Sequence, residues 1–124
     1  MSDSLHALRD ELRRFAGERD WGQFHTPKNL SSALSVEAAE LLEHFQWLQN
    51  GELAELGVEA RAEVAHEMAD VLCYLVMLAD RLEVDLLDAA RTKIALNRAK
   101  YPAEQVRGDA RKYTAYRRGD GDGI

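Results

Sequence analysis

The sequence predicts an all-α fold, a four-helix bundle, and three observations support this. Apolar residues recur at steps of three and four along most of the chain, as in helices with one buried face. Nothing alternates with a period of two for long enough to form a strand. The two prolines, Pro27 and Pro102, both stand where the helical periodicity is interrupted. At 124 residues, the chain is expected to form a single domain over residues 1–114, with a flexible tail at 115–124.

The first helix is expected over about residues 4–18, where apolar residues form an amphipathic stripe of Leu5, Leu8, Leu12 and Phe15. A connector rich in aromatic and polar side chains follows at 20–28. The second helix is expected at about 29–49, with Asn29 as its N-terminal cap and Gly51 just beyond its end.

The third helix is expected at about 59–81, after a loop or short extra turn at 53–58. Its centre, residues 71–79, is apolar on every side, which predicts that this helix is the buried one. Asp85 is expected to cap a fourth helix that reaches about Tyr101 and ends at Pro102.

Composition and charge argue against several classes of function. The formal charge is −6 and the isoelectric point is near 5.2, which argues against broad binding to nucleic acid or to anionic membranes. The single cysteine, Cys73, excludes an intrachain disulfide and fits a reducing cytoplasm. The apolar run 71–79 is too short to cross a bilayer, and the polar start carries no signal region. A soluble, cytoplasmic protein is expected.

Two acidic pairs with the same three-residue step give the strongest functional signal. They are Glu37 with Glu40, and Glu67 with Asp70, each within an otherwise apolar helical stretch. Residues three apart share a face of a helix, so each pair directs two carboxylates the same way. Either pair alone is also typical of a solvated face, but the second directly precedes an apolar run of nine residues. Buried carboxylates need a partner, and Mg²⁺ or Mn²⁺ suits their oxygens.

Aromatic groups lie a turn or two beyond each pair. Trp47 follows the first pair and Tyr74 the second, which predicts a metal centre with a flat stacking surface nearby. Trp21 and His25 in the connector are further candidates for contacting a nucleobase. Glu43 is either a further ligand or a rim residue.

The fourth helix supplies hydrogen-bond donors. Lys93, Asn97 and Lys100 fall on one stripe with Tyr101 beside it, and such donors suit the oxygens of a polyphosphate. The alternative is a solvated basic face near a helix C-terminus.

A di-iron site is disfavoured because the ferritin-like pattern needs two Glu-x-x-His steps. Glu63 and His66 make only one. A Gly-rich phosphate loop and the common hydrolase signatures are also absent, so phosphate binding must rely on the metal and the donor stripe.

At these residues the chain resembles the MazG-like superfamily of all-α nucleoside triphosphate pyrophosphatases, and within it the dCTP pyrophosphatase branch. The family motif is Glu-x-x-Glu followed downstream by Glu-x-x-Asp. The matching stretches are residues 21–30, 37–47, 67–76, 93–102 and 111–114. His44 departs from the pattern, since an apolar residue is usual there, and this leaves the base preference open.

The resemblance implies hydrolysis of a (deoxy)nucleoside triphosphate, dCTP or a modified dCTP, to the monophosphate and pyrophosphate. It implies that Mg²⁺, or Mn²⁺ as a substitute, is held by Glu37, Glu40, Glu67 and Asp70. The base and sugar would be surrounded by Trp21, His25, Trp47 and Tyr74, and the phosphates met by Lys93, Asn97, Lys100 and Tyr101. It also implies a homo-oligomer, a tetramer in preference to a dimer. The alternatives are a helical nucleotide sensor or adaptor without turnover, and a redox bundle.

Overall fold

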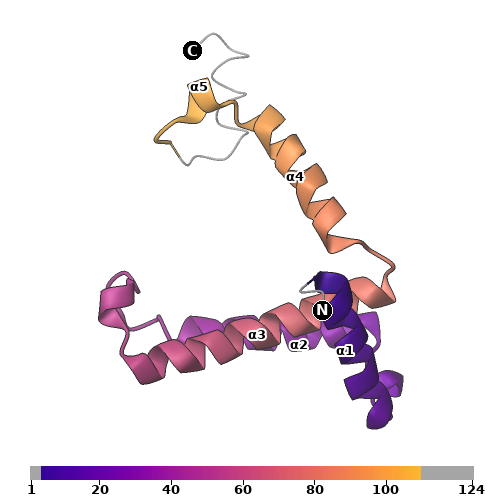
Figure 1. The fold of residues 1–124 in the computed structure, drawn as a ribbon. Helices are drawn as coiled ribbons and strands as arrows, with labels where there is room; N and C mark the ends of the chain where they lie inside the picture. Colours follow the sequence, from indigo (N-terminus) through magenta and orange to yellow (C-terminus); the bar gives the residue numbers. More distant parts are fainter. Residues whose placement is uncertain (1–3, 110–124) are drawn as a thin grey trace. The chain divides into compact units, whose positions relative to one another are not determined.

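The computed structural model describes residues 4–109, and within them it contains helices and no strand. The helices are α1 (Leu5–Glu18), α2 (Pro27–Glu43), α3 (Val58–Arg81), α4 (Leu86–Lys100) and α5 (Ala103–Val106), with short 3-10 turns η1 (Gly22–Phe24) and η2 (Leu53–Glu55) (Figure 1). The all-α fold class is therefore confirmed. The predicted tail at 115–124 and the domain end at 114 lie outside the described residues. The described residues divide into two compact units, 4–86 and 87–109.

Side-chain caps set the starts of α1 and α2. The Ser4 hydroxyl accepts a hydrogen bond from the backbone N–H of Ala7 at 3.1 Å. Thr26 does the same for Asn29 at 3.1 Å, with Pro27 as the first residue of α2. The prediction that Asn29 caps this helix was wrong: proline has no N–H to leave unpaired at the first helical position, so the helix begins earlier. The Asn29 side chain instead donates to the carbonyl of Phe24 at 2.9 Å.

The second helix also ends earlier than predicted, at Glu43 rather than Gln49. Beyond Glu43 the backbone continues in tight turns, such as the hydrogen bond from Leu48 N–H to the carbonyl of Phe45. Farther along, the backbone N–H groups of Gln49, Asn50 and Gly51 bind the side chain of Glu55. The side chain of a later residue thus replaces the helical partners that the sequence pattern had suggested.

Helices α2 and α3 make the most extensive contact in the first unit and run antiparallel as a hairpin (Figure 1). Helix α1 packs on α3 as well. The buried apolar residues among residues 4–109 are few: Ala16, Leu30, Val64, Val76 and Ala79. The core thus lies mainly between α3 and the two helices that contact it.

Helix α3, which the sequence predicts to be the buried helix, is only partly buried, with Val64, Val76 and Ala79 in the core. Leu72 and Leu75 are 40% and 37% exposed, and Met68, just before them, is 57% exposed. These three residues are spaced by four and three, so they share one side of the helix. We call Met68, Leu72 and Leu75 the α3 stripe. Too few helices pack around α3 within the first unit to cover it.

Two polar contacts fasten α3 to the N-terminal part of the chain. The Asp80 carboxylate accepts hydrogen bonds from Nε and Nη2 of Arg13 at 2.8 and 2.5 Å. One residue on, Arg81 Nη2 donates to the carbonyl of Gly22 at 2.7 Å. A bidentate guanidinium–carboxylate pair fixes both distance and orientation, so Arg13 and Asp80 help to set how α1 lies on α3.

The second unit contains most of α4, whose residues 87–100 are all exposed. The predicted fourth helix is thus present with nearly the predicted bounds. The four-residue helix α5 was not predicted; it begins after Pro102, whose carbonyl accepts from the N–H of Gln105 at 2.9 Å. Within residues 4–109, no helix combines the length and apolar character needed to span a bilayer.

Replacing Asp80 by asparagine removes the charge that pairs with Arg13 and is expected to lower the free energy of unfolding by about 1 kcal/mol at pH 7. The effect is modest because Arg13 is largely exposed and solvent weakens the pair. The hydrogen bonds from Arg13 hold the pKa of Asp80 below its ordinary value. Its contribution is therefore present above the unfolded pKa of about 4 and is lost as the pH falls through the lower folded value. Urea unfolding at pH 7 and pH 3 measures this: the gap between wild type and D80N should narrow at pH 3.

D10N is the control, because the ion-pair partners of Asp10 lie on its own helix. A D80N protein as stable as wild type at pH 7 would show that the Arg13–Asp80 pair does not hold α1 on α3.

Candidate metal centre

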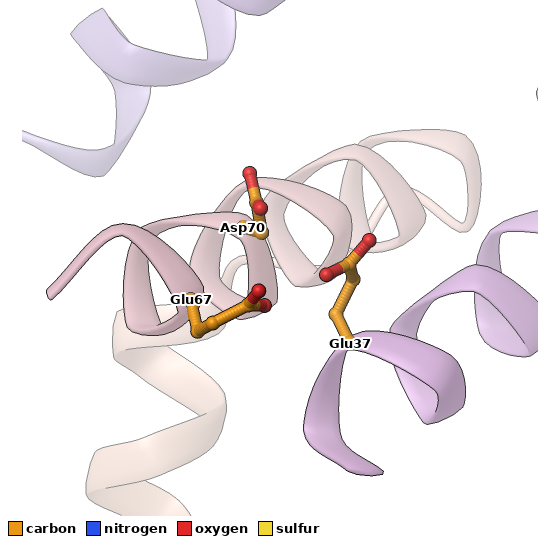
Figure 2. A group of neighbouring side chains, drawn as sticks. All are labelled: Glu37, Glu67 and Asp70. Carbon is orange, nitrogen blue, oxygen red and sulfur yellow. The ribbon is translucent and has the colours of Figure 1, made fainter. Parts of the chain in front are cut away.

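Three carboxylates meet where α2 packs on α3. Glu37 comes from α2, and Glu67 and Asp70 come from successive turns of α3 (Figure 2). One oxygen of each lies within 4.8 Å of the other two. The antiparallel hairpin explains the meeting, because Glu37 and Glu67 lie at similar distances along the chain from the connecting loop. The prediction that the two acidic pairs face each other thus holds for these three residues.

The buried oxygens in this cluster have no partner. Oε2 of Glu37 and Oε2 of Glu67 are shielded from solvent and accept no hydrogen bond from any described residue. An unpaired buried carboxylate oxygen is costly, and native proteins rarely leave one without a donor or a cation. Two such oxygens on facing helices favour a cation as their shared partner.

The acidity of Glu37 reflects the same crowding. Burial and the neighbouring carboxyls together raise the pKa of Glu37 from its ordinary value to about 7, with burial as the largest cause. The carboxyls of Glu40 and Glu67 contribute both as hydrogen-bond partners of its protonated form and by repulsion of its charged form. The cluster therefore holds more negative charge than its own residues stabilise, and a cation would relieve the repulsion.

The remaining acidic candidates lie at or beyond the edge of the cluster. Glu40 is close enough to influence Glu37 but is not one of the three converging groups. Glu43 ends α2 and is exposed, which fits the rim position that the sequence left open. Glu63 and His66 are exposed as well, so the single Glu-x-x-His step offers no buried ligand for a di-iron site.

Tyr74 lies next to the cluster on the following turn of α3. Burial raises the pKa of its phenol, and the charges of Glu37 and Asp70 raise it further. The hydroxyl thus remains protonated and can donate a hydrogen bond to an anion. Cys73 is partly buried and free, and burial, followed by the charge of Asp70, raises the pKa of its thiol. It therefore behaves as a packing residue, as its surroundings predict.

A cavity of about 270 Å³ lies farther along α3, between α3 and the N-terminal segment. It mixes apolar and charged walls, contributed by Arg9, Leu12, Arg13, Ala16, Gly17, Gly22, His25, Val76, Met77, Asp80 and Arg81. His25 is thus placed at a cavity wall. Trp21 packs edge-on against Phe15, with ring centroids 5.6 Å apart, and Arg19 stacks on Phe15 at 3.8 Å.

The other residues predicted to contact the substrate lie outside the cluster and the cavity. Trp47 lies in the turns after α2 and is 88% exposed. Lys93, Asn97 and Lys100 all lie on α4, as their spacing predicts, with Tyr101 directly after it. Their helix belongs to the second unit, so their contact with phosphates stays a prediction.

Several residues at the cavity were not predicted. Arg9 and Arg13 sit one turn apart on the polar side of α1, where they read as ordinary surface charges. Asp80 could have been noticed, because it is the first charge after the long apolar run of α3. Their meeting depends on the angle at which α1 crosses α3, which no local pattern contains.

The cluster fits a divalent cation. It offers oxygen ligands from three carboxylates, and Asp70 is exposed, so one side stays open to solvent and to a ligand. Hard cations of the Mg²⁺ or Mn²⁺ type prefer such oxygens and usually keep positions for water or substrate phosphates. Glu37, Glu67 and Asp70 would hold it.

Comparison with known proteins places the chain in a family. The MazG-like family model matches residues 32–115. The protein named dCTP pyrophosphatase 1 of Homo sapiens is 47% identical over 113 residues, which cover 90% of this chain and 66% of that protein. Its counterpart from Rattus norvegicus is 47% identical over 121 residues, covering 94% and 69%. The chain spans about two thirds of the length of these relatives.

A solved structure is similar as well. A pyrophosphatase from Archaeoglobus fulgidus superposes with a TM-score of 0.72 at 40% identity, covering 82% of this chain and 95% of the other. The fold and the facing acidic helices define an all-α protein with a candidate divalent-metal centre. The chain belongs to the MazG-like family.

A cation that binds the cluster is expected to stabilise the protein, because it pairs the orphaned oxygens of Glu37 and Glu67. At a concentration about 100-fold above its Kd, Mn²⁺ or Mg²⁺ should raise the melting temperature by several degrees. In E67Q this rise should disappear, while the melting temperature in EDTA should be equal to wild type or higher, since one repelling charge is gone. Circular dichroism melts with EDTA and with added metal measure both.

E63Q removes an exposed glutamate one turn earlier on the same helix and should keep the full metal-induced rise. An E67Q protein that responds to metal as wild type does would exclude the cluster as the cation site.

Proposed function

We propose that the protein is a Mg²⁺-dependent nucleoside triphosphate pyrophosphatase acting on dCTP or a modified dCTP. The observation that carries the proposal is the cluster of Glu37, Glu67 and Asp70 with two unpartnered buried oxygens. Membership of the MazG-like family supports the reaction class, and so does similarity to proteins named dCTP pyrophosphatase 1. The products would be the nucleoside monophosphate and pyrophosphate, formed when water attacks phosphorus and the bond between the α- and β-phosphates breaks.

The acidic residues have separate roles in this proposal. Glu37, Glu67 and Asp70 would hold the cation, which when bound would supply positive charge beside the phosphate oxygens on which negative charge develops. Glu40, at the edge of the cluster, orients the attacking water and accepts its proton, with Glu37 as the alternative base. The Tyr74 hydroxyl, protonated beside these carboxylates, donates to a substrate oxygen.

The cavity along α3 is suited to the nucleoside. Met77 in its wall lies seven residues after Asp70, roughly 10 Å along the helix axis. A bound nucleotide could therefore place its phosphates at the cation and its base near His25. Trp21 would add stacking surface there. Trp47 follows the opposite end of α2 from His25, so it would stack on a base bound by another copy of the chain in the oligomer proposed below. The donors of α4, Lys93, Asn97, Lys100 and Tyr101, would meet the phosphates.

Turnover distinguishes this proposal from a nucleotide sensor that binds without hydrolysis. Wild-type protein should release pyrophosphate from dCTP with Mg²⁺ or Mn²⁺, and EDTA should abolish the release. E67Q should lose on the order of 100-fold or more in rate, because several kcal/mol of charge stabilisation depend on the cation. Phosphate release, coupled to inorganic pyrophosphatase, measures the reaction across all canonical nucleotides and 5-methyl-dCTP.

E63Q again serves as the matched control and should keep wild-type activity. Binding of dCTP without any metal-dependent pyrophosphate release would favour the sensor and contradict the enzyme.

We also propose that the protein assembles into a homo-oligomer, a tetramer in preference to a dimer. The α3 stripe of Met68, Leu72 and Leu75 is exposed in the single chain. On a helical wheel this stripe lies well away from the side that carries Glu67, Asp70 and Tyr74. An aligned apolar stripe is what one helix needs to pack on another, so a second copy can cover it without closing the candidate site.

A charge placed in the stripe is expected to separate the subunits. L72E should shift the mass in solution from oligomer toward monomer, because two buried glutamates would face each other across the contact. V58E is the control, since Val58 is 87% exposed at the first turn of α3. Light scattering after size exclusion measures the mass, and an L72E protein with unchanged mass would contradict an interface at the stripe.

A further inference from the structure

The loop between α2 and α3 is held together by one side chain. The carboxylate of Glu55 accepts hydrogen bonds from four successive backbone N–H groups: Gln49 at 3.0 Å, Asn50 at 3.1 Å, Gly51 at 3.1 Å and Glu52 at 3.3 Å. Desolvation acts to raise the pKa of Glu55, but these donors outweigh it and hold the pKa below its ordinary value. The carboxylate is thus bound in its charged form, in a nest of backbone amides.

A second contact joins this nest to the preceding turn. Gly51 has a φ of +75°, which favours glycine, and a Cβ there would lie 2.7 Å from Cδ1 of Phe45. The Phe45 ring therefore lies directly against the Gly51 backbone. Phe45 is itself fixed by its N–H bond to the carbonyl of Leu42, at the end of α2.

Trp47 lies between these two fixed points. Its side chain is 88% exposed, so contacts of its own ring within the described residues do little to hold it. Its backbone position, by contrast, is set by Phe45 on one side and by the Glu55 nest on the other. The loop thus presents a large exposed indole on an ordered backbone, which is the arrangement expected of a stacking surface awaiting a ring.

We propose that Glu55 is a positioning residue for substrate binding, acting through Trp47. This inference rests on the proposed function, in which Trp47 stacks on the nucleobase. By closing the loop before substrate arrives, Glu55 lowers the ordering cost that binding would otherwise carry. Its effect should therefore appear in KM rather than in kcat, because the cluster of Glu37, Glu67 and Asp70 lies on the helices and not on this loop.

A double-mutant cycle tests the inference, with kcat and KM for dCTP measured in wild type, E55Q, W47A and W47A/E55Q. E55Q keeps the shape of the side chain but removes its charge and one acceptor oxygen. It should raise KM roughly 2- to 10-fold with little change in kcat, since the loop must then be ordered on binding. In the W47A background, E55Q should change KM less than about twofold, because the group it positions is gone.

E59Q removes an exposed glutamate from the first turn of α3 and controls for loss of nearby negative charge. An independent readout is the fluorescence anisotropy decay of Trp47 in a W21F background. E55Q should add a faster motion there in the free protein, and bound substrate should reduce it.

The outcomes separate the inference from the proposed function. If W47A leaves KM unchanged while dCTP is still hydrolysed, the stacking role of Trp47 is wrong and Glu55 has nothing to position. If W47A raises KM but E55Q does not, the positioning role alone is overturned. It is equally overturned if E55Q raises KM as much in W47A as in wild type. Absence of any dCTP hydrolysis would count against the proposed function, while the anisotropy decay would still test the loop.

Discussion

The repulsion among three carboxylates across the α2–α3 contact is the constraint on which the rest of this structure depends. Glu37, Glu67 and Asp70 are brought together by the same antiparallel packing that buries much of the small core. The raised pKa of Glu37 and the unpartnered oxygens show that the fold alone does not balance their charge. The cluster therefore lowers the stability of the fold on its own, as is common at sites that bind a ligand.

Helix α3 serves two purposes on two sides. One side carries Glu67, Asp70 and Tyr74 and meets Glu37 of α2. The other side carries a row of apolar residues at steps of three and four: Val64, Met68, Leu72, Leu75 and Ala79. Both ends of this row are buried within the chain, whereas its middle, the α3 stripe, is exposed. The row therefore extends beyond what the single chain covers, which favours the contact between copies proposed above.

The sequence predicted the helices and the family well, because helical periodicity and spaced acidic pairs are local patterns. The match to the MazG-like family confirms the resemblance. The end of α2 was not predictable in this way, since it depends on Glu55 reaching back to Gln49, Asn50 and Gly51. The cavity walls and the pair of Arg13 with Asp80 were missed for the same reason: they join residues distant in sequence through the crossing angle of two helices.

The most direct test of the central claim is a crystal structure of the protein grown with Mn²⁺ and a dCTP analogue that resists hydrolysis, with anomalous scattering recorded for the metal. The account predicts an anomalous peak within about 2.0–2.3 Å of oxygens from Glu37, Glu67 and Asp70, and in contact with phosphate oxygens of the analogue. A peak elsewhere, or an ordered analogue bound with no metal between α2 and α3, would contradict it.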